Sequence, residues 1–242
     1  MSELSEFWAM IWPNLGLGLI VTLKLSAGAL SIGFIIGLPV SLARVYGPQW
    51  LQSVTRAFVD VFRGTPLLVQ LFFVYYGLAD PGLNEFLAGL GLPEGLLVFS
   101  PMTAAYIALG LNSSAYQAEY FRGALQAIGS GQMIAARALG MSRLQAIRTI
   151  ILPQALRLAV APWSNEVAYM VKYTSVVSLI AVVDLFGQAR RVMSKYYNQM
   201  TMLPFVGLVY LAMVLILTAV MHVVEKQVEI PGMEVESRRH GV

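Results

Sequence analysis

The sequence predicts an all-α integral membrane protein with about five transmembrane helices, on the evidence of its composition and of its long uncharged stretches. Only 12% of the 242 residues are charged and 57% are hydrophobic, whereas soluble domains carry about 25% charged residues. Residues 25–43, 95–118 and 196–224 contain no Asp, Glu, Lys or Arg, and about 20 apolar residues suffice to cross a bilayer as a helix. Because lipid offers the backbone no hydrogen-bond partner, these segments are expected to be helical.

The chain is expected to form one domain over residues 1–242. Its spans, in chain order, are expected at about 15–43, 66–78, 102–127, 154–172 and 204–225. The second span is short, and we expect it to begin earlier, near Phe58. The fourth is expected to continue irregularly through Val183. Gly33 and Gly37 are small residues one turn apart on the first span, which predicts close contact with another helix.

The charges predict the orientation of these spans, because cytoplasmic segments of membrane proteins are enriched in Lys and Arg. With the N-terminus outside, eleven of the 16 basic residues fall in inner segments and two lie in or beside spans, which leaves three in outer segments, namely Arg190, Arg191 and Lys195. The outer segment after the second span is acidic and carries Asp80, Glu85 and Glu94. We therefore expect an outer N-terminus, a core at about 15–228 and a short cytoplasmic tail at 229–242.

The segment between the third and fourth spans, residues 129–153, is predicted to form two short helices joined by a glycine turn. Residues 132–139 are rich in alanine, a strong helix former, and Gly140 is a natural C-terminal stop. The segment either merely connects two spans or provides a docking surface for a cytoplasmic partner. Because connections are usually short and this one devotes more than 20 residues to structure, we favour the docking surface.

The second helix of this loop has its own start and stop signals. Ser142 followed by Gln145 matches a capping box, and the helix should run from there to Leu152. Pro153 breaks the pattern and can start the next helix. The residues that we expect to carry the docking function are, in chain order, Gln132, Ala135, Ala136, Gly140, Ser142, Arg143, Leu152 and Pro153.

Polar side chains within the spans are candidates for a substrate pathway, because a charge at membrane depth costs about 3 kcal/mol or more unless it is paired or hydrated. Glu119 lies three residues before Arg122, a spacing that suits a helical ion pair, and is either a structural clamp or a substrate contact. Glu166 has no opposite charge three or four residues away and is either a substrate contact or an interhelical bond. Asn112 and Ser113 belong to a polar cluster that fits helix packing or a pathway wall.

Several functions are disfavoured by what the sequence lacks. It contains no Cys and two His, which leaves no thiolate or multi-histidine metal site. None of its four Lys follows a Gly, as the lysine of an ATP-binding loop does. We therefore expect a chain that binds no metal or cofactor and is not an enzyme. The net charge of +3 reflects membrane topology, and we expect no nucleic-acid partner.

Two other classes of membrane protein remain as alternatives. A self-contained ion-coupled carrier or channel is expected to show repeated halves or paired carboxylates, and neither is visible. An intramembrane enzyme would need a nucleophile with a base, or paired Asp residues, inside the spans. Asp60, Asp80 and Asp184 all lie outside the predicted span interiors, which makes an enzyme the weaker alternative.

The predicted docking loop resembles a known family signature. Ala135-Ala136 is followed after three residues by Gly140, and after nine more by Ile150-x-Leu152-Pro153. This spacing resembles the cytoplasmic loop of ABC importer permeases. Four further segments resemble the polar amino acid branch of that family, at residues 62–70, 115–123, 165–167 and 172–175. The resemblance extends from about Thr22 to the end of the fifth span.

This resemblance implies a multi-pass permease of the bacterial cytoplasmic (inner) membrane that translocates a polar amino acid by alternating access. It implies a cytoplasmic ATPase dimer that binds ATP and Mg²⁺ and receives the loop as coupling helices. It also implies an external solute-binding protein, contact with membrane lipid and a second permease chain. The residues that we expect along the substrate pathway are Asn112, Ser113, Glu119, Glu166, Thr174 and Ser175.

The loop departs from the family signature at one position. The family usually has Glu directly before the paired alanines, whereas this chain has Ile134, so any polar contact of that Glu is missing here. This difference predicts a heterodimer with a related chain that carries the usual Glu, although a homodimer stays open.

Overall fold

The structure is a computed structural model that describes residues 2–196 and 199–228, and every regular element in this part of the chain is a helix. The all-α prediction is therefore confirmed, and the predicted tail at 229–242 lies outside the described residues. The elements are α1 (Ser2–Tyr46), α2 (Gln49–Gly64), α3 (Leu67–Phe72), η1 (Phe73–Gly77), α4 (Pro81–Gly89), α5 (Pro101–Ala127), α6 (Gly129–Ala138), α7 (Arg143–Ala146), η2 (Ile147–Ile151), α8 (Leu152–Tyr173), η3 (Thr174–Ile180), α9 (Leu185–Tyr196) and α10 (Gln199–Val228).

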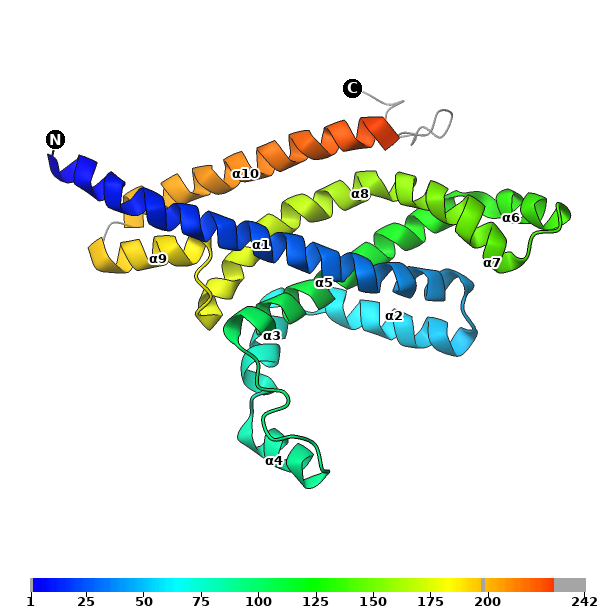
Figure 1. The fold of residues 1–242 in the computed structure, drawn as a ribbon, viewed down its shortest axis with the longest axis horizontal. Coiled ribbons are helices and arrows are strands. Elements are labelled where there is room, and N and C mark those ends of the chain that lie inside the picture. The colour runs from blue at the N-terminus through cyan, green and yellow to red at the C-terminus, as the bar shows by residue number, and fades with distance from the viewer. Residues whose placement is uncertain (1, 197–198, 229–242) are drawn as a thin grey trace.

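Helix α5 is the centre of the fold. It is packed against α1, α2 and α8 (Figure 1), while α10 covers α8 and α9. Small residues allow the close approach of α1, because a Cβ at Gly33 would lie 2.2 Å from Gln117 Nε2 and one at Gly37 would lie 2.8 Å from the carbonyl oxygen of Ser114. The close contact predicted from Gly33 and Gly37 is therefore confirmed.

Three helical segments are long and apolar enough to cross a membrane, namely Ile11–Tyr46, Arg143–Ile180 and Gln199–Val228. A fourth span results if the bent pair Gln49–Gly64 and Leu67–Gly77 counts as one. Helix α5 matches the predicted third span closely but is not among these segments. Most of its neighbours are other helices, so its buried positions include polar residues that a lipid-facing helix would avoid.

The predicted second span is wrong in one respect, since no straight helix runs from Phe58 to residue 78. The chain bends by 104° between α2 and α3. Thr65 at the bend is extended, with φ −116° and ψ 147°, because the ring of Pro66 disfavours the helical conformation in the residue before it. The first span also begins earlier than predicted, since α1 is helical from Ser2.

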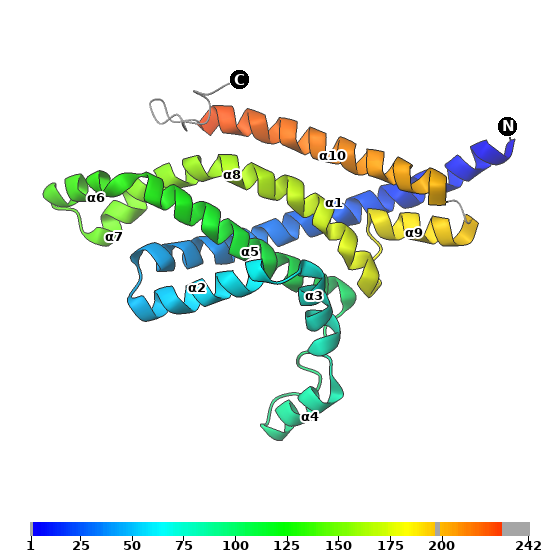
Figure 2. The same ribbon diagram turned by 180° about the vertical axis from the view of Figure 1, so that it is seen from behind.

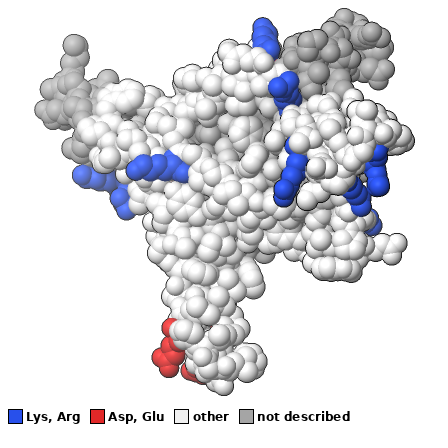
Figure 3. Space-filling model, turned by 45° about the vertical axis from the view of Figure 1, so that its right-hand side comes forward, with Lys and Arg blue, Asp and Glu red and all other residues white. Residues whose placement is uncertain are grey.

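The two ends of the molecule differ in what they carry. Figures 1 and 2 show α6 and α7 at one end of the long axis, and α9 with the start of α1 at the other. An arm that contains α4 projects sideways from the body. Acidic side chains lie at the tip of this arm, and basic side chains lie on both flanks of the body (Figure 3).

Candidate functional site

The loop between α5 and α8 has the predicted turn and cap. Gly140 adopts a φ of +85°, a left-handed conformation that favours glycine at a helix C-terminus. Its N–H donates to the Arg137 carbonyl oxygen at 3.0 Å. The capping box is confirmed, because the Gln145 N–H donates to Ser142 Oγ at 3.2 Å and the Ser142 N–H donates to Gln145 Oε1 at 2.8 Å.

The second helix of the loop differs from the prediction beyond its first turn. After α7 the chain forms a π-helical turn, η2, and then enters α8 without a break. Pro153 lies in the first turn of α8, where its missing N–H is tolerated. It does start α8, as expected, but the helical path continues through it instead of stopping.

The loop presents two faces. Ala136, Ile147 and Ile151 are buried, and the two isoleucines pack in a cluster with residues of α5 and α8. On the other side Ile134, Leu139 and Leu144 are 66%, 81% and 56% exposed. The other predicted docking residues that lie at the exposed surface are Gln132, Ala135, Gly140, Ser142, Arg143 and Pro153, whereas Leu152 is half-buried.

Glu119 is part of an ion cluster that joins α1 to α5. Arg122 donates to Glu119 Oε2 from Nε at 2.9 Å and from Nη2 at 2.7 Å. Arg44 at the end of α1 pairs with Oε1, and Arg63 at the end of α2 lies 4.0 Å from the same oxygen. The predicted ion pair with Arg122 is confirmed. The two additional arginines, Arg44 and Arg63, are at least 56 residues from Glu119 in the sequence.

Glu166 lies in a different environment, on α8 where it faces α5. Its side chain is buried, and Ser113 Oγ donates to Oε1 at 2.7 Å. Tyr120 Oη approaches Oε2 at 3.5 Å. Among the described residues, no ion pair involves Glu166. The carboxylate therefore relies on hydroxyl donors alone.

Two residues of this network were not predicted from the sequence. Gln117 Nε2 donates to Ser113 Oγ and to the Leu30 carbonyl oxygen, both at 3.0 Å, which ties α1 to the network. Trp163 Nε1 donates to Gln117 Oε1 at 2.9 Å. Tryptophans of membrane proteins are by default interface anchors, so Trp163 gave no sign of this role. The one sign in the sequence was Gln117, a polar residue within a predicted span.

Asn112 closes the bend between α2 and α3. Its Nδ2 donates to the Phe62 carbonyl oxygen and to Gln70 Oε1, both at 3.1 Å. In a continuous helix that carbonyl would accept from the N–H of residue 66, which Pro66 lacks. Gln70 Nε2 also donates to the Phe62 carbonyl, at 2.8 Å, so two side chains replace the lost helical bond. Gln70 was not predicted from the sequence.

Thr174 and Ser175 lie where α8 tightens into the 3₁₀ helix η3. Both hydroxyls donate to nearby carbonyl oxygens, Thr174 to Val171 at 2.8 Å and Ser175 to Lys172 at 2.7 Å. Thr174 is buried, whereas Ser175 borders a pocket of about 250 Å³ beside Lys172 and Tyr210. The six predicted pathway residues therefore lie at four separate places along α5, α8 and η3. Among the hydrogen bonds between described residues, only the one from Ser113 to Glu166 joins two of the six.

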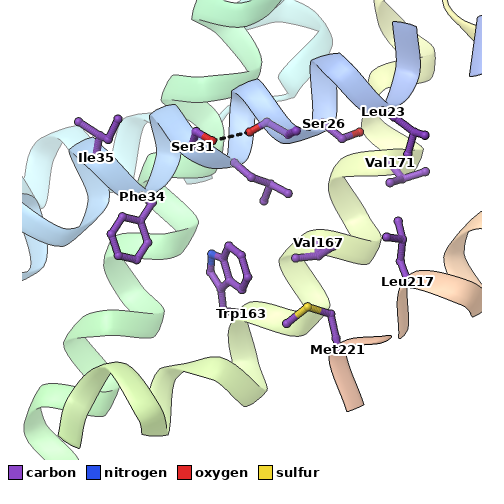
Figure 4. A pocket seen from close by; sticks show the side chains of 12 residues that line it. Leu23, Ser26, Ser31, Phe34, Ile35, Trp163, Val167, Val171, Leu217 and Met221 are labelled. Atoms are coloured by element: carbon purple, nitrogen blue, oxygen red, sulfur yellow. Dashed lines mark hydrogen bonds between the residues drawn. The ribbon is translucent and has the colours of Figure 1, made fainter. Parts of the chain in front are cut away.

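A larger apolar pocket of about 580 Å³ lies between α1, α8 and α10. Figure 4 shows its wall, with Phe34 and Ser31 of α1 on one side, Trp163 and Val167 of α8 opposite, and Met221 of α10 near them. None of the predicted pathway residues lines it. Trp163 separates it from the Glu166 network, because its indole faces the pocket and bonds to Gln117.

Comparison with known proteins places the chain in a family. The family model described as binding-protein-dependent transport system inner membrane component matches residues 29–230. The octopine transport system permease protein OccM of Rhizobium meliloti is 39% identical over 197 residues, which cover 81% of this chain and 78% of that protein. The glutamine transport system permease protein GlnP of Escherichia coli (strain K12) is 34% identical over 226 residues, which cover 92% and 98%.

Solved structures give the same result. A chain from the crystal structure of an amino acid ABC transporter with histidines is 34% identical, with a TM-score of 0.77 over 91% of this chain and 98% of that chain. A chain of the inward-facing MetNI methionine ABC transporter is 21% identical, with a TM-score of 0.73 over 92% and 99%, and shares the fold. The chain therefore belongs to the family of binding-protein-dependent transport system inner membrane components, as an ABC permease whose ATPase activity lies in a separate subunit.

Proposed function

We propose that this permease imports a polar amino acid, which an external solute-binding protein delivers and an ATPase dimer drives across the membrane by alternating access. The relatives named for octopine, glutamine and arginine transport support the substrate class. ATP and Mg²⁺ would bind to the ATPase dimer and not to this chain. The observation that carries the proposal is the apolar surface of the α6–α7 loop.

This loop surface has the character of a docking site. Ile134, Leu139 and Leu144 are exposed large apolar residues on a loop that also exposes Arg137 and Arg143. Apolar patches with polar rims mark protein contact sites on soluble surfaces. The buried face of the same loop packs on the end of α5, so a partner that moves the loop would also move the helix core.

The docking role is tested with a bulky substitution at the glycine turn. A Cβ at Gly140 would meet open space, but its φ of +85° strains any other residue. We expect Gly140→Trp to insert normally into the membrane and to lose ATPase association, measured by co-purification. Gly16→Trp is the control, because Gly16 also faces open space and lies on α1 far from the loop. Unchanged association and transport by Gly140→Trp would contradict the role.

We place five spans in the bacterial cytoplasmic (inner) membrane, with the N-terminus outside and the C-terminus inside. The second span is the bent α2–α3 pair, and the third is α5, which the other helices surround. Lipid would contact the exposed apolar faces of α1 and α10, which include Ile35 and Leu215.

The orientation is testable because the chain has no Cys. A membrane-impermeant maleimide should label Ser194→Cys on α9 in intact cells. The same reagent should label Ser130→Cys on α6 only after the membrane is permeabilised. Both native serines are exposed. The reverse labelling pattern would contradict the orientation.

The substrate pathway is proposed along α5 and α8, with Glu166 and Ser113 as its recognition pair. A buried carboxylate without a cationic partner suits the ammonium group of an amino acid. Asn112 and Glu119 hold the helices at either side of this pair, through the α2–α3 bend and the arginine cluster. Thr174 and Ser175 lie a little over two helical turns beyond Glu166, at the start of η3.

The second permease chain is proposed to be a related chain with Glu at the position of Ile134. Ile134 is exposed on the loop, so it is available to a partner and is not needed for packing. Mass spectrometry of the transporter purified from its native membrane should then find two permease chains. Finding this chain alone would show a homodimer and overturn the proposal.

A further inference from the structure

Helix α9 carries the three basic residues of the predicted outer segments, and it carries them on one side. Its buried face contains Leu185, Ala189 and Val192, which pack in a cluster with α1 and α10. The opposite side exposes Arg190, Arg191 and Lys195. Figure 3 shows basic side chains gathered at this end of the body as well as at the loop end.

These basic residues line a pocket. Its volume is about 560 Å³, and its wall combines α9 with the turn that follows η3. Ser178 and Ser194 add hydroxyl groups to the three cations. Arg190 Nη1 donates to the Ser178 carbonyl oxygen at 3.2 Å, which orients its guanidinium along the rim. None of the ion pairs between described residues includes these three cations.

The frame that supports this pocket is held by hydrogen bonds and by close helix packing. The Leu185 N–H donates to Thr22 Oγ1 at 3.1 Å, and Asp184 Oδ1 accepts from the Gly187 N–H at 2.8 Å. Tyr210 of α10 contacts the other carboxylate oxygen at 3.1 Å. A Cβ at Gly18 would lie only 2.8 Å from the Asp184 carbonyl oxygen, which shows how closely α1 approaches. Burial raises the pKa of Asp184 to about 6.

We propose that the α9 pocket is the docking surface for an acidic patch of the external solute-binding protein. The inference rests on the proposed orientation, which places α9 outside. Outer segments of membrane proteins are poor in Lys and Arg, so three of them on one exposed face point to an anionic partner. The family to which the chain belongs is itself described as binding-protein-dependent.

A protein partner fits these observations better than a lipid headgroup. The basic residues extend over more than one helical turn, from Arg190 to Lys195, and the pocket between them is wide for a single phosphate. Complementary charges across such an interface raise the association rate and fix the register of the two proteins. Docking here would also act on α8, because α9 follows η3 directly and Arg190 bonds to Ser178 of η3.

The test uses the complete transporter in nanodiscs of phosphatidylcholine, with the purified solute-binding protein added. The variant combines Arg190→Glu, Arg191→Glu and Lys195→Glu. We expect the affinity for the binding protein to fall about tenfold or more, and its dependence on salt to disappear. Basal ATP hydrolysis should be unchanged, because the loop that contacts the ATPase lies at the other end of the molecule.

Two controls keep the test decisive. Lys226→Glu reverses an exposed charge at the opposite end of α10 and should leave the affinity unchanged. The triple glutamine variant at the three α9 positions removes the charges without adding acid, and should weaken binding less than the glutamate variant. It replaces the glutamate variant if that one fails to fold.

Two results would overturn the inference. One is an unchanged affinity and salt dependence in the triple variant. The other is an effect that appears only when anionic lipid is added, because the pocket would then hold lipid phosphate. Failure of the proposed function looks different, since the wild-type transporter would then bind the solute-binding protein without stimulated ATP hydrolysis or amino acid uptake.

Discussion

Glu119 and Glu166 are two carboxylates on neighbouring helices, the first partly exposed and the second buried, and the protein surrounds them with different partners. Glu119 meets Arg44 and Arg122 directly and Arg63 at 4.0 Å. Glu166 meets the hydroxyls of Ser113 and Tyr120, without an ion pair among the described residues. The first carboxylate completes a charge cluster that joins helices. The second leaves its charge uncompensated, which suits a group that receives a charged ligand.

The largest effect is expected from breaking the compensated cluster. Glu119→Gln leaves Arg44 and Arg122 without their carboxylate, and their exposed fractions of 12% and 31% give them limited access to water. Loss of one partner from such a cluster should cost about 2–4 kcal/mol in the free energy of unfolding. Thermal unfolding in detergent measures this. Arg44→Gln in the same chain should restore part of the loss, and an unchanged unfolding temperature of Glu119→Gln would contradict the clamp.

The matching substitution at the other carboxylate should give the reverse pattern. Glu166→Gln keeps an oxygen for the Ser113 hydroxyl, so the free energy of unfolding should change by less than about 1 kcal/mol. Uptake by the reconstituted transporter should fall about tenfold or more, because the amide cannot pair with an ammonium group. Normal uptake, or a stability loss as large as that of Glu119→Gln, would remove the distinction between the two carboxylates.

A smaller effect is expected where α1 touches the Glu166 network. Gly33→Ala places a methyl group 2.2 Å from Gln117 Nε2, and overpacking of this kind costs about 1–3 kcal/mol. Gly16→Ala on the same helix meets open space and should stabilise the helix by up to about 1 kcal/mol. Unfolding of the two variants side by side tests the contact, and equal shifts of the same sign would contradict it.

The smallest effect is expected from the donor to Glu166. Ser113→Ala removes the 2.7 Å hydrogen bond and the acceptor for Gln117. Interhelical hydrogen bonds in membranes are worth about 0.6 kcal/mol on average, so stability should fall by about 1 kcal/mol. In a double-mutant cycle with Glu166→Ala, which removes the acceptor of this bond, the two effects should not add. Full additivity would mean that the two side chains act independently.

Sequence reasoning was most successful where the signals are local. The capping box at Ser142 and Gln145, the turn at Gly140 and the ion pair of Glu119 with Arg122 each lie within four residues, and each is present in the structure. The limits of α5 were also close to those predicted for the third span. Helix caps and turns are determined by the residues that form them. Two such signals therefore leave little freedom in where the helix between them begins and ends.

Several of the missed contacts depend on partners that are distant in the chain. The second span was expected to run without a bend from near Phe58, whereas the bend before Pro66 is held by Asn112, which lies 50 residues from Phe62. Arg44 reaches Glu119 across 75 residues, and Trp163 reaches Gln117 across 46. Their residue types show that they can form hydrogen bonds or ion pairs, but only the packing of α1, α5 and α8 brings the partners together.

The uninterrupted helical path from Arg143 to Ile180 has a mechanical consequence. It contains 38 residues, and at about 1.5 Å per residue its contour length is about 57 Å. It begins in the loop, passes Glu166 and ends at the turn before α9. Because the path is continuous, a small tilt imposed at its loop end is passed along the chain to the end that leads into α9. The π-helical turn at η2 is wider than an α-helical turn. It is the place along this path where such a tilt can be damped or transmitted.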